Sequence, residues 1–142
     1  MCICTQMNLD HPSNCLTFNL QRAVRSMVRG FEASIQGAGL TAPQFSTLAM
    51  LFGYGERTVG QMADYMGTDR TTLTRNLDLI AAKGWIEAIE TEDRRLRVWR
   101  LTETGRDRLE AAMPAWKEWQ ARLVGVLGED AARGLLAAAS KL

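Results

Sequence analysis

The sequence predicts a mainly α-helical fold with one small β-hairpin. Apolar residues recur three and four positions apart over 16–35 and again over 102–127, which is the spacing of one buried helical face. Between these stretches, short apolar segments begin with a Thr–x–x–Gln pair and stop at glycine. Only residues 85–101 contain two short segments, WIEAIE and LRVWRL, that are rich in β-branched and aromatic residues.

The composition indicates one globular domain spanning 1–142, with 46% hydrophobic and 23% charged residues. The formal net charge is only +1, so a nucleic-acid role must depend on where the arginines are placed. No apolar run is long enough to span a bilayer, and the opening MCICTQMNLDHPSNC lacks the features of a secretion signal. We therefore expect a cytoplasmic protein without a membrane partner.

An N-terminal arm over 1–14 is expected to lead into a long amphipathic helix. Gly37 and Gly39 end this helix. Its apolar stripe consists of Leu16, Leu20, Ala23, Val24, Met27, Phe31 and Ile35.

Two shorter helices are expected next, and both carry the same capping signal. Thr41 and Gln44 have the spacing of a capping box, in which each side chain hydrogen-bonds the backbone of the other residue. Thr58 and Gln61 repeat this spacing, and Gly67 ends the second of these helices.

The fourth helix, 69–83, combines a buried stripe with an unusual polar face. Its apolar stripe is formed by Leu73, Leu77 and Ile80, and its polar arc by Thr71, Thr74, Arg75 and Asp78. A solvated face usually carries Glu and Lys pairs, whereas hydroxyls beside a guanidinium suit the major groove of DNA. About three residues join this helix to the preceding one, as in a helix-turn-helix.

Arginines also gather in the predicted hairpin, at Arg94, Arg95, Arg97 and Arg100. Arginine at a hairpin tip can enter the narrow minor groove of DNA, and the neighbouring Asp93 can orient it. A basic hairpin directly after a helix-turn-helix has the position of a wing. The sequence therefore predicts a winged helix-turn-helix core over 41–102, with its wing at 85–101.

The two ends of the chain are expected to form dimerisation helices, at 15–36 and 103–142. They carry more apolar surface than a small central module can cover, and a second copy of the chain would cover it. Pro114 is expected to bend the first C-terminal helix. The alternative to a homodimer is that the two ends pack on each other within a monomer.

Three segments, taken in order, resemble the MarR family of bacterial transcriptional regulators: LTAPQFSTLAML, TVGQMADYMGTDRTTLTRNLDLIAAKGWIE and EDRRLRVWRLTETG. The last resembles the family's wing signature, an Asp-x-Arg followed by a strand that ends Leu-Thr-x-x-Gly, here Asp93, Arg95, Leu101, Thr102 and Gly105. The resemblance implies a homodimer that binds a pseudo-palindromic double-stranded DNA operator. It also implies repression of transcription until a small ligand or an oxidant weakens binding.

The resemblance covers roughly residues 15–127 and assigns the DNA contacts. The contacts from the recognition helix would be Arg70, Thr71, Thr72, Thr74 and Arg75. Arg95 would enter the minor groove with Asp93 positioning it, and Arg94 and Arg97 would contact phosphates.

The resemblance also implies a site for an aromatic or amphipathic effector between the dimerisation helices and the winged domain. The candidate lining residues are Phe18, Arg22, Phe31, Phe45, Met50, Trp116 and Trp119. Ordinary core packing is the alternative for the apolar members of this set.

Thiol chemistry at Cys2, Cys4 and Cys15 is a second route to regulation. Cys15 stands at about the place of the peroxide-sensing cysteine of some family members, but LTAP at 40–43 lacks the tyrosine that accompanies it there. A thiolate site for a soft metal or an arsenical, with His11 nearby, is another possibility. The third is that these thiols are incidental and play no part in regulation.

Catalytic motifs are absent from the sequence. His11 is the single histidine, and no nucleophile elbow, zinc-protease signature or phosphate-binding Gly-Lys motif occurs. We therefore expect neither an enzyme nor a bound cofactor. The rival function is a winged helix that binds other proteins and not DNA.

Overall fold

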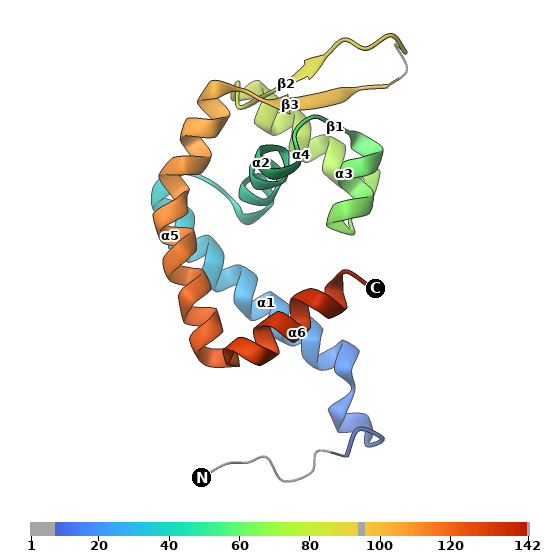
Figure 1. Ribbon diagram of the computed structural model, residues 1–142, viewed down its shortest axis with the longest axis vertical. Coiled ribbons are helices and arrows are strands. Elements are labelled where there is room, and N and C mark those ends of the chain that lie inside the picture. Colours follow the sequence, from blue (N-terminus) through green and yellow to red (C-terminus); the bar gives the residue numbers. More distant parts are fainter. Residues whose placement is uncertain (1–7, 94–95, 142) are drawn as a thin grey trace.

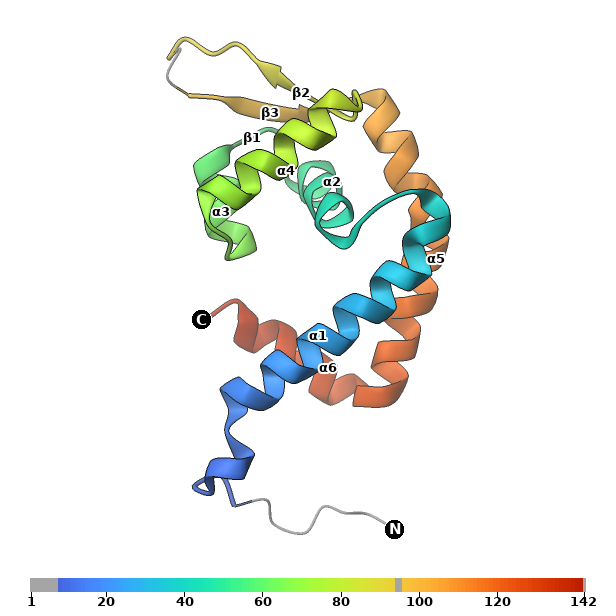
Figure 2. The ribbon, with the colours of Figure 1, turned by 180° about the vertical axis from the view of Figure 1, so that it is seen from behind.

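The computed structural model describes residues 8–93 and 96–141, which form two lobes joined by long helices. Figures 1 and 2 show one lobe built from α2, α3, α4 and the sheet, and another built from α1, α6 and the C-terminal part of α5. The fold is mainly helical with one small sheet, as the sequence predicts.

The helices of the second lobe are α1 (Leu16–Ile35), α5 (Glu103–Leu127) and α6 (Glu129–Ala139). Short 3₁₀ turns, η1 (Pro12–Asn14) and η2 (Gln36–Ala38), flank α1. Thr102 begins α5 by accepting a hydrogen bond from the Gly105 backbone N–H, and α5 continues through Pro114. The predicted ends of these helices are confirmed to within a few residues.

The winged-helix lobe contains α2 (Ala42–Tyr54), α3 (Val59–Met66) and α4 (Arg70–Ala82). Both predicted capping boxes are present, at Thr41 with Gln44 and at Thr58 with Gln61. Gly67 ends α3 in the left-handed conformation, which a residue without Cβ adopts at little cost, and the chain turns directly into α4.

Within the described residues the sheet has three strands, one more than the sequence predicted. β2 (Ile86–Ile89) and β3 (Val98–Leu101) form the predicted hairpin, and β1 (Arg57–Thr58) adds to the other edge of β3. All pairing is antiparallel, with Trp99 opposite Arg57 on one side and Ala88 on the other. The two-residue β1 is too short to show an alternating pattern, so sequence reasoning missed it.

The hydrophobic core lies in the winged-helix lobe and reaches into the first half of α5. Its largest fully buried side chains include Trp99, Ile35, Leu48, Met62, Leu73, Leu77, Ile80 and Ile86. Full burial of one such aliphatic side chain contributes roughly 1.5–3 kcal/mol relative to leaving it exposed. This core holds α2, α3, α4 and the sheet in one arrangement.

The other lobe leaves apolar side chains uncovered. Exposed large hydrophobic residues of its helices are Leu16, Phe18, Leu20, Val24, Val28, Val126, Leu135 and Leu136. If the chain were a monomer, its two ends would cover each other only in part, because the apolar side chains listed above stay exposed to solvent. Among the described residues, no helix is long and apolar enough to cross a membrane.

Candidate DNA-binding surface

Helix α4 is attached to the core by its predicted apolar stripe. Leu77 and Ile80 are 0% exposed and Leu73 is 2% exposed. Asp69 is the N-cap, and its Oδ1 accepts the Thr72 backbone N–H at 2.8 Å. Hydrogen bonding by Thr72, through its side chain first and its backbone second, holds the pKa of the Asp69 carboxyl below its ordinary value.

The five side chains assigned to DNA contact on α4 differ in what they can offer. Arg70, Thr71 and Arg75 are exposed. Thr72 is exposed but takes part in the Asp69 cap. The half-buried Thr74 donates its hydroxyl to the Arg70 carbonyl oxygen at 2.7 Å, which leaves its methyl group and the oxygen lone pairs for a partner.

Arg70 lies against the first turn of α3. A Cβ added at Gly60 would be 3.3 Å from Arg70 Nη2, tighter than an ordinary contact. The missing side chain at Gly60 therefore leaves room for this guanidinium beside the start of α3. Arg70 links the two helices of the helix-turn-helix on its exposed side.

Asn76 anchors α4 to α2, a role that the sequence analysis did not identify. Its Nδ2 donates to the Thr47 Oγ1 at 2.9 Å and to the Pro43 carbonyl oxygen at 3.4 Å. Thr47 is fully buried and donates its own hydroxyl to Pro43 at 2.9 Å. This small network fixes the rotation of α4 about its axis, and with it the direction of the exposed face.

Arg97 connects the hairpin to α4. Its Nη1 lies 3.6 Å from the Asp78 Oδ1, and its guanidinium carbon lies 4.6 Å from the centre of the Trp99 ring. Both members of the ion pair are more than half exposed, so the pair contributes little to stability. Arg100 is engaged within the hairpin, where its Nε donates to the Glu87 Oε1 at 2.7 Å.

The turn at the hairpin tip is only partly described. The Asp93 carbonyl oxygen accepts the Thr91 hydroxyl at 2.8 Å and the Leu96 N–H at 2.9 Å. Arg94 and Arg95, assigned to phosphate and minor-groove contact, lie outside the described residues.

The Leu-Thr-x-x-Gly signature joins the hairpin, α4 and α5. The Thr102 hydroxyl donates to the Gly84 carbonyl oxygen at 2.7 Å, and the Thr102 N–H donates to the Trp85 carbonyl oxygen at 3.1 Å. A Cβ at Gly105 would overlap the same Trp85 oxygen. Only glycine allows the first turn of α5 to approach the segment between α4 and β2 so closely.

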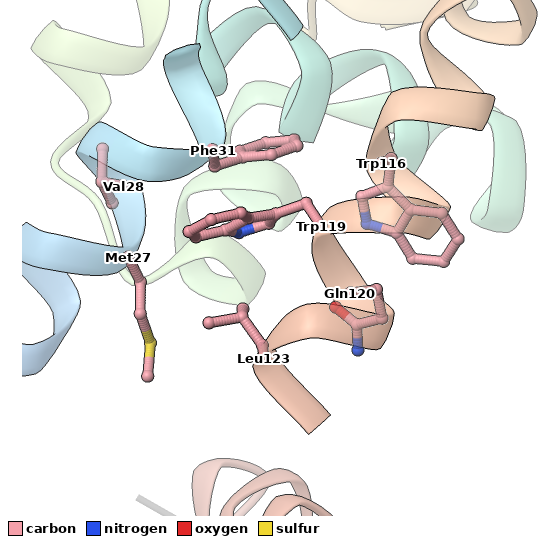
Figure 3. Close-up of a pocket in the computed structure, with 7 residues that line it drawn as sticks. All are labelled: Met27, Val28, Phe31, Trp116, Trp119, Gln120 and Leu123. Carbon is pink, nitrogen blue, oxygen red and sulfur yellow. The ribbon is translucent and has the colours of Figure 1, made fainter. Parts of the chain in front are cut away.

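An aromatic pocket of about 190 Å³ lies between α1 and α5, and Figure 3 shows its lining. It brings together three of the predicted effector residues, Phe31, Trp116 and Trp119. Its other lining residues are Met27, Val28, Gln120 and Leu123. A Cβ at Gly30 would overlap the Trp119 ring, so Gly30 lets this indole lie against the backbone of α1.

The remaining predicted effector residues do not line this pocket. Phe45 lies behind it in the core, with its ring 5.1 Å from Phe31 and 6.4 Å from Trp116 between centroids. Met50 is buried within the core, where it fills space between helices. Phe18 and Arg22 are exposed near the start of α1.

Cys15 is an exposed free thiol at the N-cap of α1 and makes no side-chain capping hydrogen bond. Cys2 and Cys4 lie outside the described residues. In the described part of the chain, no three His, Cys, Asp or Glu side chains gather as a metal site would require.

Known proteins share this arrangement. The sequence model of the MarR family matches residues 38–96. The M. tuberculosis transcriptional regulator MosR, solved in complex with DNA, is similar with 30% identity and a TM-score of 0.78, covering 89% of this chain and 95% of that chain. A comparison with curated protein sequences finds no match.

Two further solved structures extend the comparison. The transcriptional repressor CouR bound to a 23-mer DNA duplex is similar with 26% identity and a TM-score of 0.80, covering 96% of this chain and 98% of that chain. The oxidized form of MarR from E. coli has 21% identity and a TM-score of 0.73, covering 89% and 92% of the two chains, and shows the shared fold alone.

Proposed function

Because this chain belongs to the MarR family of transcriptional regulators, we propose that it is a homodimeric repressor that binds a pseudo-palindromic DNA operator. The observation that carries the proposal is the exposed face of α4. Arg70, Thr71 and Arg75 project from a helix whose opposite side is locked into the core. A helix held in this way can enter the major groove as a rigid unit.

Each contact has a chemical reason. The guanidinium of Arg75 can donate two hydrogen bonds to the O6 and N7 acceptors of guanine, and the Thr71 methyl can contact thymine. Arg70 lies at the edge of the face beside α3, where phosphates would pass, and Arg94 and Arg97 would add phosphate contacts from the wing. Arg95, positioned by Asp93, would enter the minor groove.

Dimerisation would supply the second half-site. Apolar side chains are exposed on α1, from Leu16 to Val28, and on α6 at Leu135 and Leu136. An exposed apolar surface of this kind is typical of a protein–protein interface. A second copy offers the same stripe in a self-complementary interface. Two α4 helices related by a twofold axis would then read half-sites about one helical turn apart.

A small aromatic or amphipathic molecule in the aromatic pocket would release the operator. The pocket is mostly apolar, and its lining also carries the Gln120 amide and the indole nitrogens of Trp116 and Trp119, which suits a ring with a polar substituent. Helix α5 extends from this pocket to Thr102 and Gly105, which contact the backbone of Gly84 and Trp85 just after α4. A shift of α5 caused by displacement of Trp119 would therefore move the C-terminal end of α4. Thiol chemistry at Cys2, Cys4 and Cys15 is the alternative release mechanism, and Cys15 is exposed as it requires.

A titration of DNA from the native upstream region at two salt concentrations tests the proposal. We expect a specific complex whose affinity falls steeply with salt. Arg75→Ala should weaken it by about 1–3 kcal/mol, while Arg133→Ala, which removes an exposed arginine from α6, should change it little. If no specific complex forms anywhere in the upstream region, the chain is instead a winged helix that binds other proteins.

A further inference from the structure

A second and larger groove lies where α1, η2, the first turn of α2 and the end of α4 meet. Its volume is about 510 Å³, within the range of roughly 300–1,000 Å³ typical of small-molecule sites. It shares no lining residue with the aromatic pocket. Its polar lining includes Glu32, Gln36, Thr41, Gln44 and Lys83.

Gln44 lines this groove and carries an amide nitrogen without a partner among the described residues. Its side chain is only 7% exposed, and its Oε1 accepts the Thr41 N–H at 3.1 Å as part of the capping box. Its Nε2 donates no hydrogen bond to any described residue. This nitrogen still has some access to solvent, because Trp99 Nε1 is the only side-chain nitrogen or oxygen of the described residues that is both fully buried and without a partner. A ligand oxygen could accept from this amide N–H in place of water, which would add one hydrogen bond to the complex.

Opposite charges border the same groove from different helices. Lys83, the C-cap of α4, holds its ammonium 4.5 Å from the centre of the Trp85 ring. Glu32 stands on α1. Within the described residues, neither Lys83 nor Glu32 forms an ion pair.

Arg108 adds to the positive potential near Lys83. It lies over the same Trp85 ring, with its guanidinium carbon 5.3 Å from the ring centre, and donates to the Ala38 carbonyl oxygen at 3.3 Å. The residues that line the groove therefore include two that can donate to an anion, Lys83 and Gln44, and one with a carboxylate for a cation, Glu32.

We propose that this groove binds a free α-amino acid. The ligand carboxylate accepts hydrogen bonds from Lys83 Nζ and Gln44 Nε2, and the ligand ammonium pairs with Glu32. A simple anion would be repelled by the Glu32 carboxylate, and a simple cation would be repelled by the Lys83 ammonium. A zwitterion can instead pair its negative group with Lys83 and its positive group with Glu32. This site is separate from the aromatic effector pocket and does not depend on DNA binding.

Isothermal titration of the full chain with the standard L-amino acids, one at a time, tests the proposal. We expect at least one to bind with a Kd of about 1 mM or tighter. Acetate and methylamine, which each carry one of the two charges, should bind at least about tenfold more weakly. If no amino acid binds, or if acetate binds as well as the best of them, the proposal is wrong.

Gln44→Glu provides the sharpest variant, because it keeps an oxygen to accept the Thr41 N–H and replaces the donor with a carboxylate. Binding should fall at least about tenfold, as it should in Lys83→Met, which removes an exposed charge and should change the free energy of unfolding only slightly. Glu129→Gln and Arg133→Met, which remove an exposed ion pair on α6, are the matched controls and should bind as the wild type does. Wild-type binding by Lys83→Met and Gln44→Glu would overturn the assignment, whatever the outcome of the DNA titration.

Discussion

Helices α1 and α4 are both amphipathic, but α4 buries its apolar stripe within one chain, whereas the first part of α1 leaves apolar side chains exposed. Leu77 and Ile80 of α4 are 0% exposed, whereas Leu20, Val24 and Val28 of α1 are 44%, 53% and 41% exposed. Helix α4 is also tied to α2 by Asn76. The orientation of the α4 face that we propose to contact DNA is therefore set inside each chain, whereas the exposed apolar side chains of α1 are left for a further surface to cover.

Substitutions in the two helices should therefore affect different properties, folding in one case and assembly in the other. A change in the stripe of α4 should affect the folding of the single chain. A change at Leu20, Val24 or Val28 of α1 should affect assembly first, because these three side chains contribute less buried area within one chain.

The largest effect is expected from Leu77→Ala. Removal of this fully buried side chain leaves a cavity and should lower the free energy of unfolding by about 2–5 kcal/mol. Leu79→Ala on the same helix is the matched control, because Leu79 is 61% exposed and its loss should cost within about 0.5 kcal/mol. Denaturant unfolding measures both, and equal losses would contradict the assigned orientation of α4.

A charge in the stripe of α1 should separate the protomers without unfolding the winged-helix lobe. Val24→Asp should raise the dimer dissociation constant by about a hundredfold, since a carboxylate would be buried without a partner. Ser26→Asp lies about 200° further round the helix and should leave it unchanged. Sedimentation equilibrium reports the masses, and an undiminished dimer in Val24→Asp would place the interface elsewhere.

Loss of the Asn76 anchor should act on both stability and DNA affinity. Asn76→Ala should lower the free energy of unfolding by about 0.5–1.5 kcal/mol. In the double variant, Thr47→Val should lower it by less than it does alone, because both substitutions disrupt the same hydrogen-bond network. Operator affinity should fall while its salt dependence stays the same, since the amide faces α2 and not a phosphate. A smaller salt slope would show that Asn76 contacts DNA directly.

The smallest effect concerns the Asp69 cap and acid. Hydrogen bonding by Thr72 lowers the pKa of Asp69 in the folded state, so its stabilising contribution is present above the ordinary value of about 3.9 and is lost as pH falls through the folded value. Asp69→Asn keeps a capping oxygen that does not titrate. The stability difference between wild type and this variant should shrink as pH is lowered below about 4, and a constant difference would contradict the cap.

Local signals in the sequence predicted most of the fold. The Thr41 and Thr58 capping boxes and the stripe of α4 depend on residues three or four apart, so they can be read without tertiary structure. Strand β1 could not be predicted from local sequence, because its two residues form a strand only by pairing with Val98 and Trp99.

The candidate sites divide in the same way. Thr71 and Arg75 could be assigned from helical periodicity, and the structure places both on the exposed side. The partners of Asn76 lie on another helix, and Phe18 and Met50 share apolar character with the pocket residues without sharing their location. Aromatic type alone cannot separate a pocket wall from a core or an interface.

The spacing of the two half-sites is the strongest test of a dimer that binds both halves of the operator. Once the operator has been located by footprinting, about five base pairs, half a helical turn, are inserted between its halves, and binding of the wild-type protein is titrated against the original and the altered DNA. We expect the affinity to fall to the nonspecific level, because two α4 helices fixed in one dimer can no longer face the same side of the duplex. Equal affinity for both DNAs would contradict a dimer that reads both halves at once.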